Sequence, residues 1–139
     1  MAHIKFSTDS ASDIPAALRE EWNIQVLPFP IAMGDREYMD GFDFTPDEFF
    51  QMLLDSPQIP THAQLNPYLF TECFEKTWKE GYTDLIHTSI NSKGSATYGN
   101  AIPVSYTHLD VYKRQPWRTP WPSAMGKTTF LCSATPMWE

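Results

Sequence analysis

The chain has 139 residues, 42% of them hydrophobic, which is enough for one domain core and leaves little room for two. Its formal net charge of -7 argues against a nucleic-acid partner, because nucleic-acid binders usually carry a basic surface. It has no apolar run of about 18 residues and no signal-peptide pattern, which predicts a cytoplasmic protein without stable membrane insertion.

The first half of the chain predicts short strands joined by polar turns. Alternating side chains indicate the strands, and Pro15 at an early helical position indicates the first helix. Gly34 and Asp35 give a turn signal for a hairpin that projects from the main sheet. In chain order, these elements are a strand over 3–8, a helix over 16–22, a strand over 24–29 and a hairpin over 31–33 and 36–38.

The second half predicts two helices with clear start signals, followed by a strand. Thr45 and Glu48 match a capping box, and the helix that they start is expected to run to about Asp55. Asn66 is expected to cap the next helix, which Gly81 ends. The remaining elements are a strand over 84–90, a serine-rich loop over 91–98 and a further helix.

This order of elements predicts an α/β fold with an open, mainly parallel sheet and flanking helices over residues 1–102. The expected core residues are Ile4, Phe6, Val26, Leu27, Leu85 and Ile86. Three polar clusters, at 8–10, 61–64 and 92–97, follow strands or precede helices. Ligands collect at such places in open α/β sheets, where helix starts favour anions. The clusters would therefore suit a carboxylate or a phosphate.

Four stretches at these positions resemble the DegV family of fatty-acid-binding proteins. They are Thr8–Asp13, Tyr38–Phe50, Pro60–Pro67 and Ser92–Tyr98, in the family's order. The resemblance covers only the first domain of the family, so residues 1–102 are interpreted as an incomplete lipid-binding domain. It implies a carrier, without enzymatic activity, that binds a long-chain fatty acid between two domains. It further implies delivery of the fatty acid to a separate fatty-acid kinase.

The resemblance also nominates residues for the fatty-acid carboxylate. Where the family usually has Thr-Ser-Gln, this chain has His62-Ala63-Gln64, so His62 or the adjacent Thr61 would replace a hydroxyl donor. At the second position, Ser95 is a better candidate than Ser92, because it lies near a helix start. The predicted ligand-binding residues are Thr61, His62, Ser92 and Ser95.

The composition changes after residue 102. Residues 1–102 hold 6 Lys+Arg against 15 Asp+Glu, whereas the remaining residues hold 4 against 2. Val104–Gln115 reads as the translation of two abutting transposon ends used in sequencing-library preparation. We therefore interpret residues 103–139 as an artefactual or unrelated tail that is disordered and forms no domain, with the origin of 116–139 left open.

A second function class stays open beside the carrier. A small-molecule phosphotransferase or hydrolase could use Asp9, His62 and Ser95, although nothing in the sequence pairs them as nucleophile, base and orienting group. A direct hydrogen bond between Ser95 and His62 would favour catalysis. No cofactor is implied. No metal site is predicted either, because Asp40 and Asp43 look like turn formers and the two cysteines lie far apart.

Overall fold

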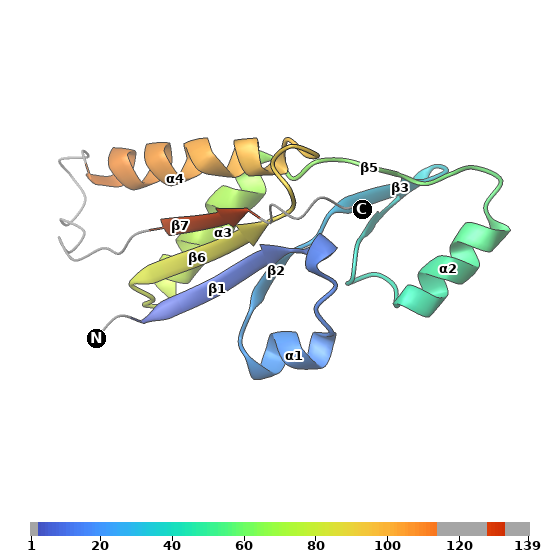
Figure 1. Ribbon diagram of the computed structural model, residues 1–139, viewed down its shortest axis with the longest axis horizontal. Coiled ribbons are helices and arrows are strands. Elements are labelled where there is room, and N and C mark those ends of the chain that lie inside the picture. Colours follow the sequence, from blue (N-terminus) through green and yellow to red (C-terminus); the bar gives the residue numbers. More distant parts are fainter. Residues whose placement is uncertain (1–2, 114–127, 133–139) are drawn as a thin grey trace.

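The computed structural model describes residues 3–113 and 128–132, with side chains described for residues 3–105. Its main sheet has four parallel strands in the order β2-β1-β6-β7 (Figure 1). These strands are β1 (Ile4–Asp9), β2 (Gln25–Leu27), β6 (Asp84–Ser89) and β7 (Thr128–Cys132). Because all four are parallel, their carboxyl ends meet at one edge of the sheet. The predicted fold class is therefore confirmed.

A second, three-stranded antiparallel sheet projects beyond that edge (Figure 1). The predicted hairpin forms two of its strands, and Gly34 takes a positive φ of 61° at the turn, which glycine adopts without steric cost. The sequence did not predict the third strand, which pairs His62 with Ile31. In sheet order the strands are β4 (Arg36–Met39), β3 (Pro30–Met33) and β5 (Thr61–His62).

Three of the helices begin at the residues that the sequence indicated. The hydroxyl of Thr45 accepts from the Glu48 backbone N–H, and the Glu48 carboxylate accepts from the Thr45 N–H, which completes the predicted capping box. The side chain of Asn66 accepts from the Leu69 N–H. The helical elements are η1 (Ser10–Ser12), α1 (Ala16–Glu21), α2 (Pro46–Asp55), α3 (Pro67–Lys79) and α4 (Thr97–Lys113).

Helices α3 and α4 cover one face of the main sheet (Figure 1). The predicted core residues Leu27 and Leu85 point into this face and are 4% and 0% exposed. The other main members of the core are Phe29, Leu65, Phe70, Cys73, Phe74, Trp78, Ala101 and Val104. The core is thus built between the sheet and the α3–α4 layer.

The opposite face of the main sheet corrects part of the core prediction. Ile4 and Phe6 were expected in the core but are 43% and 49% exposed, and Val26 and Ile86 are only half-buried. Helix α1 buries no residue. The strand alternation was read correctly, but the apolar residues of β1 point away from α3 and α4. Polar residues of β1 and β6 occupy the covered face instead: Lys5, Ser7, Asp9, His87 and Ser89.

Two described segments of residues 103–139, the part of the chain interpreted as a disordered tail, join this layer. Val104 and Ser105 are 3% and 7% exposed within α4, and β7 pairs with β6 from Leu85 to Ser89. The edge of β6 offers unpaired backbone groups, and the Thr-Thr-Phe-Leu-Cys segment has high β propensity. Residues 114–127 and 133–139, which carry most of the predicted disordered tail, lie outside the described residues. The artefact interpretation stays a prediction.

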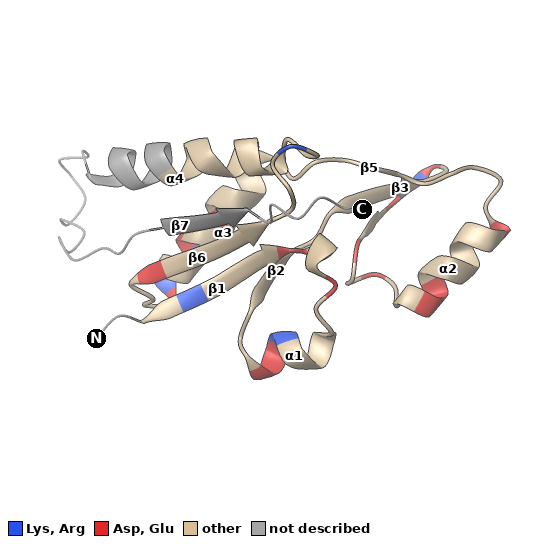
Figure 2. Cartoon of the chain, viewed as in Figure 1, with Lys and Arg blue, Asp and Glu red and all other residues tan. Residues whose placement is uncertain are grey.

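The Lys, Arg, Asp and Glu residues of the described chain are distributed over several helices, strands and loops (Figure 2). Within the described part of the chain, no group of three or more His, Cys, Asp or Glu side chains could hold a metal ion. Among the same residues, no helix is both long and apolar enough to cross a membrane.

Candidate functional site

The carboxyl end of β1 holds a buried carboxylate. Asp9 is 2% exposed, and its Oδ2 accepts hydrogen bonds from the Ile90 backbone N–H at 2.7 Å and the Ser89 hydroxyl at 3.2 Å. Burial raises the pKa of Asp9, although the hydrogen bonds from Ile90, Ser89 and the Ala11 N–H act in the opposite direction. Asp9 therefore ties the end of β1 to the point where the chain leaves β6.

Ser10 makes the corresponding link on the other side of β1. Its hydroxyl accepts from the Phe29 backbone N–H at 3.0 Å, and both residues are buried. Phe29 lies between β2 and β3, so this bond fixes the point where the chain passes from the main sheet to the small one. The first predicted polar cluster thus anchors the segments on both sides of β1.

The start of α4 carries a pair of hydroxyls. The Oγ of Ser95 accepts from the Thr97 backbone N–H at 3.2 Å, so Ser95 forms a local turn that leads directly into the helix. The Ser95 hydroxyl in turn donates to Thr97 Oγ1 at 3.0 Å. Because both groups are hydroxyls that rotate freely, this bond can reverse, so that Thr97 donates to Ser95 and the Ser95 proton turns to an acceptor outside. Ser95 is half-buried, so its hydroxyl is accessible to such an acceptor.

Thr97 and Asn100 fasten this helix start to the segment between β5 and α3. The Leu65 N–H donates to Thr97 Oγ1 at 3.4 Å, and the Asn100 side chain donates to the Leu65 carbonyl at 2.8 Å. Thr97 and Leu65 are fully buried. The second and third predicted polar clusters are therefore held together through backbone and side-chain hydrogen bonds, although they lie about thirty residues apart in sequence.

Thr61 and His62 are both exposed, and strand geometry separates their side chains. They are consecutive residues of β5, so their side chains project to opposite faces of the small sheet. The ring of His62 meets Phe29 edge-on, with centroids 6.1 Å apart. A single carboxylate is therefore expected to contact one of the two residues from this strand. Ser92 is exposed in the loop after β6.

The hydrogen bonds do not favour the enzyme alternative. Within the described residues, no hydrogen bond joins Ser95 to His62, and Ser95 pairs with Thr97 instead. The structure contains a different serine–histidine contact, Ser7 Oγ to His87 Nδ1 at 2.8 Å, in the covered face of the sheet. Both residues are buried, and burial lowers the pKa of His87 to about 4. No substrate can reach this pair without displacing α3.

His87 is therefore a packed residue inside β6. Its ring lies edge-on to Phe70 and Phe74 of α3, with centroids 5.3 and 6.4 Å away. The neighbouring thiol of Cys73 is 3% exposed, and burial raises its pKa to about 12. Such a thiol stays protonated and unreactive at neutral pH.

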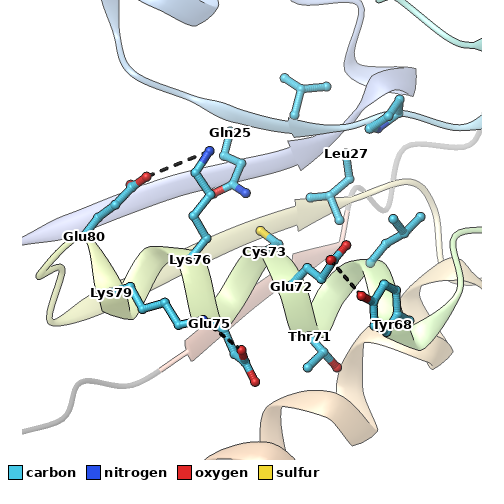
Figure 3. Close-up of a pocket in the computed structure, with 13 residues that line it drawn as sticks. Gln25, Leu27, Tyr68, Thr71, Glu72, Cys73, Glu75, Lys76, Lys79 and Glu80 are labelled. Atoms are coloured by element: carbon cyan, nitrogen blue, oxygen red, sulfur yellow. Dashed lines mark hydrogen bonds and ion pairs between the residues drawn. The ribbon is translucent and has the colours of Figure 1, made fainter.

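A separate groove of about 730 Å³ runs between the sheet edge at β2 and helix α3 (Figure 3). Apolar side chains such as Leu27 and Leu69 line its wall, and the charged residues of α3 line its rim, where Lys76 pairs with Glu80. None of the four predicted ligand-binding residues lines this groove. It is thus distinct from the hydroxyl pair at the start of α4.

Sequence reasoning missed two residues that organise the candidate site. Asn100 was not singled out, and Thr97 was noted only as a member of a polar cluster. Both act through their bonds to Leu65, which is distant in sequence, and no local pattern reports such a contact. The short strand β5 was missed for the same reason, because two residues give no periodic signal.

Comparisons with known proteins identify the family. A family model described as an uncharacterised protein of the DegV family matches residues 3–111. DegV domain-containing protein TTE1491 of Caldanaerobacter subterraneus is 36% identical over 102 residues, and CA_C0701 of Clostridium acetobutylicum is 34% identical over 101 residues. Each alignment covers 73% of this chain and 36% of the relative. The chain therefore spans little more than a third of these relatives.

Solved structures show the same fold. DegV from Bacillus subtilis, described as a fatty-acid-binding protein, superposes with a TM-score of 0.74 at 17% identity, covering 95% of this chain and 43% of that one. A stearic-acid-binding protein from Eubacterium ventriosum gives 0.73 at 22% identity, covering 94% and 41%. At these identities the likeness establishes the fold. Together with the family match over 3–111, it shows that this chain belongs to the DegV family.

Proposed function

We infer that this chain binds a long-chain fatty acid and holds its carboxylate at the start of α4, beside the carboxyl ends of β1 and β6. One observation carries the proposal: the Ser95–Thr97 hydroxyl pair at a helix start is pinned to the segment that follows His62. Hydroxyl donors and a helix N-terminus both favour a carboxylate. Related structures are described as binding fatty acids, including stearic and vaccenic acid.

The proposed contacts to the fatty-acid carboxylate come from two segments of the chain. Ser95 donates its hydroxyl proton to the carboxylate while Thr97 donates to Ser95. From the other side, His62 donates a ring N–H, or Thr61 its hydroxyl if the ligand lies on the opposite face of β5. Ser92 is a further donor candidate in the same loop as Ser95. These groups bind and orient the head group, and no covalent step is required.

The acyl tail needs more apolar surface than the head-group contacts provide. Each methylene removed from water contributes about 0.8 kcal/mol, so an incompletely covered tail forfeits several kcal/mol. We propose that the remaining two thirds of a family-length protein supplies part of that cover. The 139-residue chain alone is then an impaired binder. In the family-length protein, the proposed role is a cytoplasmic carrier that presents its fatty acid to a separate kinase.

The test is a titration with cis-parinaric acid, a fluorescent long-chain fatty acid. It compares the 139-residue chain with a chimera in which the C-terminal part of CA_C0701 extends the chain to family length. We expect saturable binding by the chimera and much weaker binding by the shorter chain. Equal affinity of the two would contradict the proposed division of the site, and absence of binding by both would contradict fatty-acid binding itself.

Residue substitutions then locate the carboxylate. Introduced into the chimera, Ser95→Ala should weaken the binding of cis-parinaric acid by about 1–3 kcal/mol, the scale of a hydrogen bond to a charged group. Ser56→Ala is the matched control, because Ser56 bonds only within its own turn at the end of α2. Unchanged affinity of Ser95→Ala would remove Ser95 from the site. Comparing His62→Ala with Thr61→Ala shows which face of β5 the ligand uses.

A further inference from the structure

Burying the Asp9 carboxylate at the end of β1 costs folding free energy. Its carboxylate is 2% exposed, and among the described residues no cation pairs with it: its partners are the Ile90 N–H, the Ser89 hydroxyl and the Ala11 N–H. A buried carboxylate held only by neutral donors costs desolvation energy that a neutral acceptor would avoid. This cost calls for a reason beyond fold stability.

Two of the three hydrogen-bond partners of Asp9, Ser89 and Ile90, lie where β6 ends and the loop that carries Ser95 begins. Ser89 is the last residue of β6, and Ile90 is the first residue after it. The 2.7 Å bond from the Ile90 N–H therefore fixes the direction in which the loop leaves the sheet. At its other end the loop is fixed by Thr97, which bonds Leu65. Ser95 lies between these two fastened points.

A neighbouring pair shows what is particular to Asp9. Ser7 lies two residues earlier on the same face of β1 and bonds His87 of β6 at 2.8 Å. Both contacts join β1 to β6 inside the covered face. Only the Asp9 contact extends past the end of β6 to a loop amide. Both contacts can stabilise the fold, but of the two only the Asp9 contact reaches the point where the loop leaves the sheet.

We propose that Asp9 is a positioning residue of the ligand site: its carboxylate holds the exit of β6 so that the loop presents the Ser95 hydroxyl to the fatty-acid carboxylate. Asp9 does not touch the ligand. This inference rests on the proposed fatty-acid site and adds a residue to it that acts through another. Its substitution should reduce affinity by displacing the donor, while the donor itself is still present.

The experiment combines two measurements on the same proteins. Backbone amide hydrogen exchange of the 139-residue chain is compared for the unaltered protein, Asp9→Ala, Asp9→Asn and Ser7→Ala. Asp9→Ala should speed exchange at Ile90 and through the loop to Thr97, and Ser7→Ala should not. Affinity for cis-parinaric acid, measured in this chain and in the family-length chimera, should fall on the order of tenfold in Asp9→Ala, the loss expected for one hydrogen bond to a charged group.

The conservative variant separates positioning from folding. Asp9→Asn keeps an oxygen acceptor for the Ile90 N–H, so it should recover most of the affinity that Asp9→Ala loses. It also keeps the test valid if Asp9→Ala fails to fold. Ser7→Ala should retain the unaltered affinity despite losing a buried hydrogen bond.

The outcomes separate the inference from the proposed function. If the unaltered protein binds and Asp9→Ala binds equally well, the inference is wrong and the fatty-acid site stands. If Ser7→Ala and Asp9→Ala lose affinity equally, the effect is general destabilisation and the inference is also wrong. If neither unaltered protein binds cis-parinaric acid, the proposed function fails and the inference fails with it.

Discussion

The two faces of the main sheet differ in a way that reverses the usual expectation. The covered face of β1 carries polar side chains, Ser7 and Asp9, each bonded to a partner on β6, while the open face carries Ile4 and Phe6. Buried polar groups are tolerated when they are hydrogen-bonded. On the covered face, β1 is therefore joined to β6 by hydrogen-bonded polar side chains, while the apolar row on the open face contributes little to the core.

The comparison predicts that the largest stability losses come from the covered face. Phe70 is fully buried and packs edge-on against His87, so Phe70→Ala should lower the free energy of unfolding by about 3–5 kcal/mol. Phe50 on α2 is 62% exposed and serves as the matched control, for which a much smaller loss is expected. Urea denaturation of both variants measures the difference. Equal losses would show that the α3 layer is not the main core.

The second prediction concerns acid sensitivity of the same face. The folded-state pKa of His87 is lowered to about 4 from 6.5, so the fold favours the neutral ring. The resulting stability, about 3 kcal/mol, is fully present above pH 6.5 and is lost as the pH falls toward 4. His87→Asn keeps an acceptor for Ser7 but cannot titrate, so its unfolding free energy should fall less steeply over this range. Identical pH profiles would contradict the prediction.

The titration of Asp9 changes the free energy of unfolding with pH in the direction opposite to that of His87. Its folded-state pKa is raised above 3.8, so the ionised carboxylate costs stability at neutral pH. That cost disappears as the pH falls through the folded-state pKa. The loss caused by His87 should therefore be clearest in the upper part of its range, where Asp9 is ionised in both states.

The third prediction tests the cross-strand contact that does not reach the loop. Ser7→Ala leaves the Nδ1 atom of His87 buried without the hydroxyl, which should cost about 1–3 kcal/mol. Ser12→Ala is the control, because Ser12 is exposed and its hydroxyl bonds only the nearby Asp9 carbonyl. Chemical denaturation measures both. A loss no larger than that of the control would mean that the Ser7–His87 contact contributes nothing net.

Local signals predicted the elements well because caps and turns are local chemistry. Thr45 with Glu48, and Asn66 before Pro67, fix helix starts through contacts within a few residues. The orientation of β1 was read wrongly because alternation shows that two faces differ and not which face is covered. That choice depends on where α3 and α4 pack, and on side chains such as His87 that provide partners for buried polar groups.

The candidate site was predictable only in outline. The polar clusters at strand and helix ends were identified from their positions, and the resemblance singled out Ser95. The bonds that hold the clusters together join Thr97 and Asn100 to Leu65, and Asp9 to Ile90. These contacts depend on strand order, which brings the ends of β1 and β6 side by side, and a single sequence does not state that order.

The smallest effect on stability is expected on the open face. Phe6 is 49% exposed, so Phe6→Thr, which keeps a residue suited to a strand, should change the free energy of unfolding by only about 0.5 kcal/mol.

Substitutions on the open face should affect self-association of the chain more than they affect its stability. Ile4 and Phe6, with Val26 and Ile86 beside them on paired strands, give this face an apolar character that favours self-association. In sedimentation velocity, the 139-residue chain should show concentration-dependent association that the Ile4→Thr, Phe6→Thr double variant reduces. The matched control, Leu54→Thr, removes an 80% exposed apolar residue from α2 and should leave association unchanged. If association persists in the double variant and disappears in the control, the surface through which the chains associate lies on α2 and not on the sheet.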